Sequence, residues 1–337
     1  MRSWGVVWST VGNMDLSVGL TTSSSIEMVK WLAHNVDDLG LRGVWTGEDI
    51  GRPQEIFTVT CLILLETKRV NVGIGVASPF IRNITTVARA AVALNEISPG
   101  RFRLGLGVGG LQDLASMGVQ VEKPVESMRK IVETLKGIWK DRKTVTSKEL
   151  RLKNYKTSFA PADIPIFMGV RGPRLLSLAA EIAGGIILSG PKEYVKESIK
   201  LVRERRVTAG LTETDFSFVL WVPTIMLSGD RDLELAKRVV AIVASDTPDK
   251  VLTTADVSLD EVNKIRSILR RGGAKEAARN VSEELIDKFC ISGDAERISE
   301  VFRSYSSLRI DEVVFGPPYG RNPRDAIQQV AKAWGRT

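Results

Sequence analysis

Histidine and cysteine are scarce in this chain of 337 residues. It has one histidine, His34, and two cysteines, Cys61 and Cys290. These counts exclude a histidine-based catalytic triad, a histidine-ligated metal centre and a disulfide framework. His34 falls on the polar face of the helix predicted around it, so we assign it no catalytic role. We predict no metal site.

Long apolar runs are absent too. No stretch reaches the roughly 18 apolar residues that a membrane span needs, and the opening segment MRSWGVVWST lacks the pattern of a signal peptide. We therefore expect a cytoplasmic protein without membrane contact. The net charge is +7, but basic and acidic residues are interleaved and no nucleic-acid motif accompanies them, so we expect no nucleic-acid partner. The basic balance suits an anionic cofactor or reflects a hot habitat.

What the chain contains is a regular alternation of short apolar strands and amphipathic helices. Eight such units of roughly 40 residues predict an α/β fold, a (β/α)8 TIM barrel, because a doubly wound sheet would more often need five or six strands. We expect a single domain over residues 1–337. The expected strands are Ser3–Trp8, Gly43–Thr46, Val70–Ala77, Arg103–Val108, Pro165–Gly169, Gly185–Leu188, Ser217–Met226 and Asp311–Phe315.

Two insertions interrupt the alternation. Residues 141–162 are polar and alternating, which predicts a hairpin before the fifth strand. Residues 246–292 predict a helical excursion before the last strand. Connections of this length are usually lids, ligand walls or subunit contacts.

Glycines and polar residues follow several of the predicted strands, and ligands of such barrels bind at the carboxyl ends of the strands. Residues 105–110 read GLGVGG and match GxGxxG, but no helix follows directly, which argues against a dinucleotide fold. Glycines there let the backbone approach a flat ring or a phosphate. A tight turn without a ligand is the alternative.

Anion-binding groups are predicted after the fifth, sixth and eighth strands. Arg171 and the free amides at the start of the following helix suit a phosphate, and Ser189-Gly190 repeats the arrangement; plain helix caps are the alternative. Arg321, after the last strand, is a candidate to hold a substrate carboxylate. Glu48 and Asp49, just past the second strand, are candidates for acid–base catalysis or for a simple surface pair.

The segments PFIRNITTVARAAVALNEISPGRFRLGLGVGG and MGVRGPRLLSLAAEIAGGIILSG resemble the luciferase-like flavin and deazaflavin barrel superfamily. Within it, the chain is most similar to the archaeal methylenetetrahydromethanopterin reductases. IPIFMGVRGP, DTPDKVL, ELIDKFCISGD and VVFGPPYG extend the resemblance over nearly the whole chain. It implies a hydride transfer from the reduced deazaflavin coenzyme F-420 to a methylene-tetrahydropterin, in one-carbon metabolism.

The resemblance also implies roles for particular residues. A non-prolyl cis peptide is expected at Gly75-Val76, behind the deazaflavin ring, and Glu48 takes the place of a family acid near that ring. The family's acids of the first strand and of the glycine-rich segment are replaced by Val7 and Gly110, although Asp113 is nearby. The residues expected to hold the cofactor are Gly75, Val76, Ala77, Ser78, Gly107, Gly109, Gly110, Gly169, Val170, Arg171, Gly172, Ser189 and Gly190.

Three functions are weighed on these grounds. The first is a coenzyme F-420-dependent reductase that acts on a pterin-type substrate, with Glu48 or Asp49 as the acid. The second is an FMN-dependent luciferase-like monooxygenase, although many of these use a histidine that the chain lacks. The third is a cofactor-binding protein without catalysis. The resemblance implies a homo-oligomer, a dimer or a tetramer.

Overall fold

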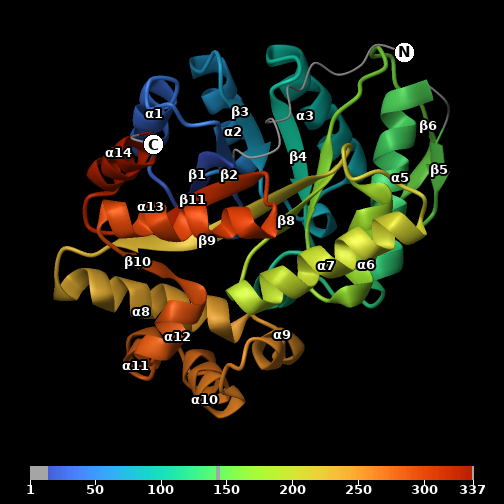
Figure 1. Ribbon diagram of the computed structural model, residues 1–337. Helices are drawn as coiled ribbons and strands as arrows, with labels where there is room; N and C mark the ends of the chain where they lie inside the picture. Colours follow the sequence, from blue (N-terminus) through green and yellow to red (C-terminus); the bar gives the residue numbers. More distant parts are fainter. Residues whose placement is uncertain (1–13, 142–144, 336–337) are drawn as a thin grey trace.

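Eight parallel strands close into a barrel in this computed structural model, which describes residues 14–141 and 145–335 (Figure 1). Each strand pairs with the next one along the chain, and pairing of the last strand with the first closes the ring, with Asp15 opposite Glu312. The predicted (β/α)8 fold is confirmed. The barrel strands are β1 (Asp15–Thr21), β2 (Gly43–Gly47), β3 (Asn71–Ile74), β4 (Phe102–Leu106), β7 (Ile166–Gly169), β8 (Gly185–Leu188), β9 (Ser217–Met226) and β11 (Glu312–Tyr319).

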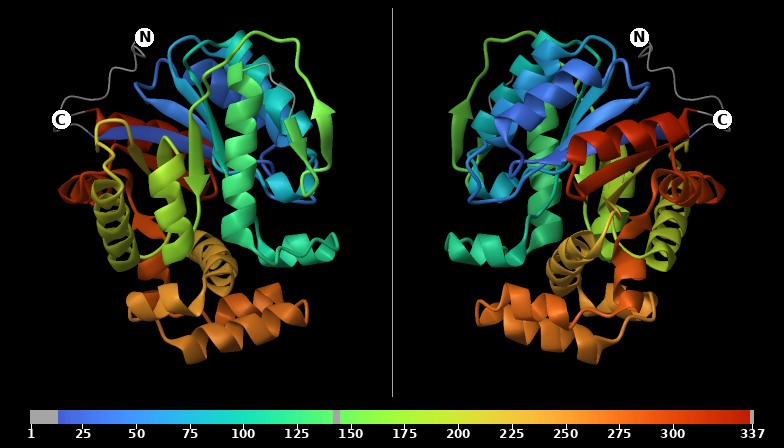
Figure 2. Two further views of the ribbon diagram at one scale, coloured as in Figure 1. Left: turned by 90° about the vertical axis from the view of Figure 1, so that its right-hand side faces the viewer. Right: turned by 90° about the vertical axis from the view of Figure 1, so that its left-hand side faces the viewer.

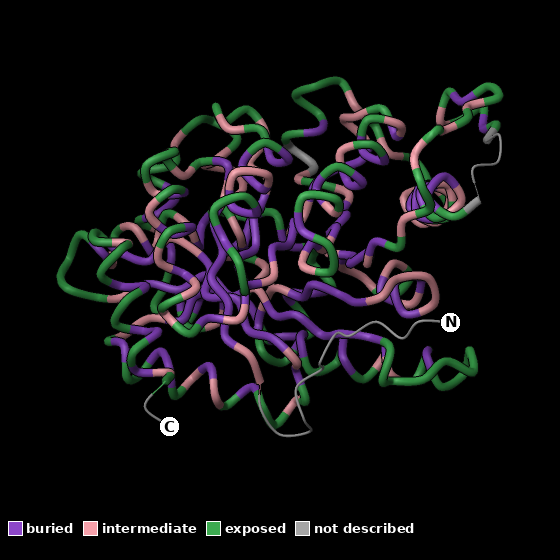
Figure 3. Tube along the Cα trace, turned by 90° about the horizontal axis from the view of Figure 1, so that it is seen from above, coloured by how far each residue is buried: buried purple, intermediate pink, exposed green. Residues whose placement is uncertain are grey.

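Helices surround the barrel and pack their apolar faces on it. In α5, for example, Met128, Val132, Leu135 and Trp139 share the buried face, as their spacing predicts. Figure 3 shows the buried residues concentrated at the centre of the molecule. No helix among the described residues is long and apolar enough to cross a membrane. The surrounding helices are α1 (Ile26–Asn35), α2 (Ile56–Glu66), α3 (Ile84–Ile97), α5 (Pro124–Asp141), α6 (Pro173–Ile182), α7 (Lys192–Thr208), α13 (Ala295–Ser304) and α14 (Pro323–Trp334).

The first barrel strand differs from the prediction. It is β1, Asp15–Thr21, whereas the predicted strand Ser3–Trp8, with Val7, lies outside the described residues. Two inward positions of β1 lack a large apolar side chain. Ser17 donates a hydrogen bond to the Glu312 carboxylate, and Gly19 lies beneath the indole of Trp221. This composition hid the strand, because pattern reasoning expects large apolar residues at inward positions.

Both predicted insertions are present. The hairpin consists of β5 (Val145–Ser147) and β6 (Leu152–Tyr155), paired antiparallel. The helical insertion begins earlier than the predicted residue 246, because α8 packs on the insertion's own apolar core. Figure 2 shows the insertion and the short helix α4 (Leu111–Ser116) projecting on the same side of the barrel. The insertion consists of α8 (Asp230–Ser245), α9 (Asp249–Thr254), α10 (Leu259–Arg270), α11 (Ala274–Arg279) and α12 (Glu283–Phe289), and β10 (Ile291–Gly293) then extends the sheet beside β9.

Bulky side chains fill the barrel interior opposite glycines of neighbouring strands. A Cβ on Gly73 would lie 2.3 Å from the ring of Trp45, and one on Gly185 would lie 2.3 Å from the ring of Phe167. The two rings pack edge to face, with centroids 5.4 Å apart. The core therefore requires glycine at these positions for space.

We expect Gly73→Ala to destabilise the protein by about 1–3 kcal/mol, because the added methyl group overpacks against Trp45. Gly137→Ala is the matched control, since Gly137 lies inside α5 with nothing within 4 Å of the added Cβ. It should be neutral or stabilising by up to about 1 kcal/mol. Urea denaturation measures both. Equal effects of the two substitutions would contradict this interpretation of the core.

Candidate functional site

Val76 lies at the centre of the predicted site. The expected cis peptide at Gly75-Val76 is present. A Cβ on Gly107 would come within 2.6 Å of one γ-carbon of Val76, and a Cβ on Gly169 within 2.5 Å of the other. These two glycines are therefore needed to accommodate Val76. Val76 in turn joins the ends of β3, β4 and β7 at the carboxyl end of the barrel. We call this end of the barrel the mouth.

The loops after β3 and β4 are tied together next to Val76. The Ala77 amide donates to the Gly105 carbonyl (3.0 Å), and the Gly107 amide donates to the Ala77 carbonyl (3.2 Å). The Ser78 hydroxyl donates to the Val108 carbonyl (2.7 Å), and Ser78 is buried. The predicted ring-binding segment is thus a fixed backbone surface, with the hydroxyl of Ser78 already engaged. Gly109 follows in the left-handed region, at φ +97°, and Gly110 is the N-cap of α4. The expectation that no helix follows residues 105–110 directly is therefore wrong; what excludes the dinucleotide fold is the closed barrel.

Glu48 is held in place by two partners. Its carboxylate forms an ion pair with both terminal nitrogens of Arg82 and accepts a hydrogen bond from the Ser78 amide (3.1 Å). Burial acts to lower the pKa of Arg82, but the bonds and charges of Glu48 and Glu55 outweigh it and raise that pKa. Arg82 already neutralises the charge of Glu48. We therefore interpret Glu48 as a residue that holds the loops after β2 and β3 together.

Three other carboxyl groups, those of Asp49, Asp113 and Asp246, lie near one another at the mouth. Asp49 accepts a hydrogen bond from the Ser23 hydroxyl (2.6 Å). Loss of solvent around Asp113 and the charge of Asp49 raise the pKa of Asp113. Desolvation and the charge of Asp113 likewise raise the pKa of Asp246, at the end of α8. An Oδ2 of Asp113 lies 2.9 Å from the place of a Cβ on Gly110, so this carboxyl occupies the space of the missing side chain.

The predicted phosphate-binding segments lie on the neighbouring part of the mouth. Gly172, at φ +85°, precedes α6 and gives that helix no side-chain cap, and its amide donates to the Tyr194 hydroxyl (3.4 Å). The Arg171 guanidinium donates to the Thr247 hydroxyl (3.2 Å), so it reaches across to the insertion. Burial lowers the pKa of Arg171. Val170 is buried, whereas Ser189 and Gly190 are half-buried at the end of β8.

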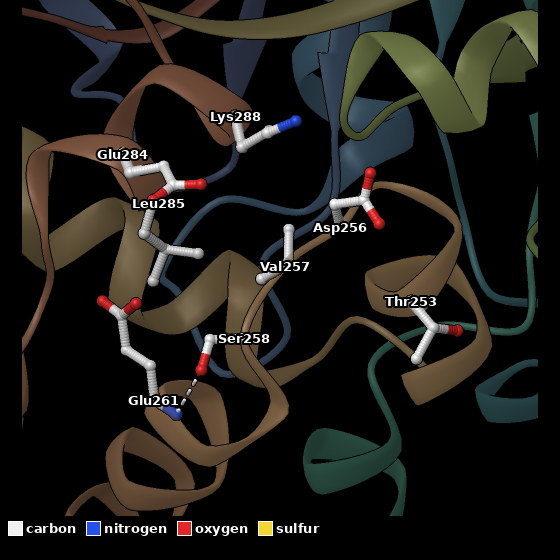
Figure 4. A pocket seen from close by; sticks show the side chains of 8 residues that line it. All are labelled: Thr253, Asp256, Val257, Ser258, Glu261, Glu284, Leu285 and Lys288. Carbon is white, nitrogen blue, oxygen red and sulfur yellow. Dashed lines mark hydrogen bonds between the residues drawn. The ribbon is translucent and has the colours of Figure 1, made fainter.

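Arg321 lies apart from these residues, on the β11 and β1 side of the mouth. It lines a pocket of about 580 Å³ between the starts of α1 and α14. A second pocket, of about 500 Å³, lies within the insertion and contains none of the predicted site residues (Figure 4). In that pocket Glu261 accepts a hydrogen bond from the Ser282 amide (2.8 Å), and Lys288 pairs with Glu193 (3.4 Å).

Sequence reasoning missed Trp221, which is partly buried on the inward face of β9. Its indole extends across the mouth: a Cβ on Gly19 of β1 or on Gly316 of β11 would come within 2.6 or 2.5 Å of it. Alternation along SFVLWVPTIM would have placed it inward. Asp246, Tyr194 and Arg82 were missed as well, because their contacts join distant segments.

We expect Glu48→Gln to destabilise the protein by about 3 kcal/mol, because it leaves Arg82 without its main partner in a site where both side chains are mostly buried. Glu55→Gln is the control: Glu55 is 49% exposed and pairs with the same guanidinium (3.2 Å). That substitution should cost about 1 kcal/mol or less. Thermal and urea unfolding compare the two. Equal costs would show that Glu48 does not hold the loops together.

Comparison with known proteins identifies the family of this chain. The family model described as luciferase-like monooxygenase matches residues 10–312. A 5,10-methylenetetrahydromethanopterin reductase of Archaeoglobus fulgidus is 30% identical over 307 residues, which cover 88% of this chain and 91% of the relative.

Solved structures show the same fold. The coenzyme F-420-dependent tetrahydromethanopterin reductase of Methanopyrus kandleri superposes with a TM-score of 0.82 at 21% identity, covering 96% of this chain and 98% of that one. An F-420-dependent secondary alcohol dehydrogenase, in complex with an F-420–acetone adduct, gives a TM-score of 0.74 at 16% identity, covering 95% and 98%. The resemblance predicted from the sequence is confirmed: the chain belongs to the luciferase-like monooxygenase family.

Proposed function

We propose that this protein is a coenzyme F-420-dependent oxidoreductase that reduces a methylene-tetrahydropterin to its methyl form. The observation that carries the proposal is the similarity to a methylenetetrahydromethanopterin reductase, which is 30% identical over 88% of this chain. The backbone surface around Val76 lies at the mouth, where the ligands of such barrels bind. When bound, the reduced cofactor supplies the hydride. The related alcohol dehydrogenase indicates that this fold serves other substrates too.

The residues at the mouth fit a flat ring with an anionic tail. Glycines make room there for the side chain of Val76, so a ring at the mouth would lie against Val76 and the backbone beside it. The uncapped start of α6 presents amide groups suited to a phosphate. We propose that the ring is bound by Gly75, Val76, Ala77, Ser78, Gly107, Gly109 and Gly110, and the tail by Gly169, Val170, Arg171, Gly172, Ser189 and Gly190.

Reduction of the substrate breaks a carbon–nitrogen bond and requires a proton at that nitrogen. Asp113 suits this task because its raised pKa favours the protonated form and its carboxyl replaces the side chain absent from Gly110. Asp49 lies near enough to raise that pKa, and we propose that it assists by its charge. Glu48 then positions the loops through its ion pair with Arg82.

A titration of the purified protein with coenzyme F-420 and, separately, with FMN tests the cofactor. We expect tight binding of the deazaflavin and weak binding of FMN, followed by oxidation of the reduced deazaflavin on addition of a methylene-tetrahydropterin. Preference for FMN with oxygen consumption would favour the monooxygenase function that the family description names. Tight binding without turnover on any pterin would favour a cofactor-binding protein.

We expect Asp113→Asn to lower kcat on the order of a hundredfold while the dissociation constant for coenzyme F-420 is unchanged. Because the acid must be protonated and its pKa is raised, wild-type kcat should fall as pH rises through that pKa, and the variant should lose this dependence. Asp256→Asn, an exposed substitution in the insertion, is the control. An unchanged kcat in Asp113→Asn would exclude Asp113 as the proton donor.

A further inference from the structure

The pocket beside Arg321 lies next to the mouth but is separate from the surface around Val76. It opens where β1 and β11 end and where α1 and α14 begin, and Figure 1 shows these two helices next to each other. Thr21, at the end of β1, connects it with the mouth: the Thr21 methyl group and the Trp221 indole both lie 3.5 Å from the place of a Cβ on Gly47. A molecule at the mouth can therefore extend into this pocket.

Two cationic side chains of the pocket are unpaired. Within the part of the chain that the structure describes, the guanidinium groups of Arg321 and Arg324 form no ion pair and no hydrogen bond; Arg324 stacks over the Trp31 ring at 5.7 Å. The one acidic residue that lines the pocket, Asp325, accepts a hydrogen bond from Gln329 (2.8 Å). The lining thus carries an excess of positive charge.

The nearby carboxylate of Asp232 forms no salt bridge with these arginines, although burial of Asp232 is outweighed by hydrogen bonds and by the charge of Arg321, which together lower its pKa. It is fully buried and accepts hydrogen bonds from the Ser228 amide (2.9 Å), the Ser228 hydroxyl (2.6 Å) and the Arg321 amide (2.9 Å). The bond to the Arg321 amide fixes the backbone of the loop after β11. The guanidinium group is thereby left exposed on a fixed loop.

Tyr319 fixes the end of β11 beside the pocket. It is among the lining residues but is only 4% exposed, and its ring packs edge to face on Phe315 with centroids 5.0 Å apart. Its hydroxyl is closed to solvent and has no hydrogen-bond partner among the described residues, so it does not face the open pocket. The groups available to a ligand are therefore the two arginine side chains.

We propose that this pocket binds a carboxylate on the tail of the substrate, held by Arg321 and Arg324. The assignment to the substrate rests on the proposed function. The phosphate-bearing tail of the cofactor is expected on the other side of the mouth, at Gly172 and Ser189, and this separation leaves the β11 side to the second reactant. The tail of the cofactor is the competing source of the same anionic chemistry.

Steady-state kinetics with two substrates test the proposal. In Arg321→Gln/Arg324→Gln, KM for a methylene-tetrahydropterin with a carboxylate tail should rise about tenfold or more, because each charge-assisted hydrogen bond contributes roughly tenfold in affinity. KM for the same pterin without a tail, kcat, and the dissociation constant for coenzyme F-420 should be unchanged. Arg89→Gln, an exposed substitution on α3, is the charge control. Equal KM changes for both substrates, or weaker cofactor binding, would overturn the proposal.

Binding without turnover provides a second readout. Calorimetric titration with the dipeptide γ-glutamyl-glutamate should show binding to the wild type and at least tenfold weaker binding to Arg321→Gln/Arg324→Gln. This variant should unfold at nearly the same temperature as the wild type, because both side chains that it changes are exposed. Equal binding by both proteins would overturn the proposal. Because the titration needs no cofactor, it tests the pocket even if coenzyme F-420 fails to bind and the proposed function falls.

Discussion

The barrel depends on a fit between bulky inward side chains and glycines on adjacent strands. Eight strands leave an interior just wide enough for side chains, and this chain fills it with two tryptophans and a phenylalanine. Trp45 lies over Gly73, Phe167 over Gly185, and Trp221 over Gly19 and Gly316. A side chain at any of these glycines would come within 2.7 Å of an aromatic ring. The close packing of these rings therefore fixes the distances between strands.

The same principle shapes the mouth. Val76 occupies the space over Gly107 and Gly169, which holds three strand ends in one arrangement. A buried ion pair lies deeper in the barrel, where Glu312 contacts Arg103 (2.6 Å) and the Trp45 indole (2.7 Å). These three polar side chains of the interior thus satisfy one another. The reacting groups of the proposed function are instead supplied by loops after the strands, as is usual for this fold.

Much of the fold could be predicted from local patterns, and the exceptions have physical reasons. Strands β2, β3, β4, β7, β8, β9 and β11 were visible because their apolar residues cluster between turns. β1 was not visible, because its inward residues Ser17 and Gly19 are small. They contact Glu312 and Trp221, which lie far away in the sequence. The start of α8 was misassigned to the barrel because its apolar spacing is the same whether it packs on the barrel or on the insertion.

The position of the candidate residues at the carboxyl ends of the strands could be predicted from the sequence, but their contacts could not. Glycines after β4 and β7 marked the mouth correctly, yet what they accommodate is Val76, a residue of the chain itself. The charge of Glu48 is neutralised by Arg82, 34 residues away, which no local pattern reveals. The Asp113 carboxyl occupies the place of a Gly110 side chain because α4 turns it back. Contacts that form only in the folded chain decide these positions.

The central claim is that a hydride passes at this mouth from a deazaflavin to a one-carbon unit. An anaerobic single turnover with reduced coenzyme F-420 carrying deuterium at its hydride position, followed by mass spectrometry of the pterin product, tests it most directly. We predict one deuterium atom in the new methyl group. A product without deuterium, or no product while the cofactor remains tightly bound, would contradict the claim.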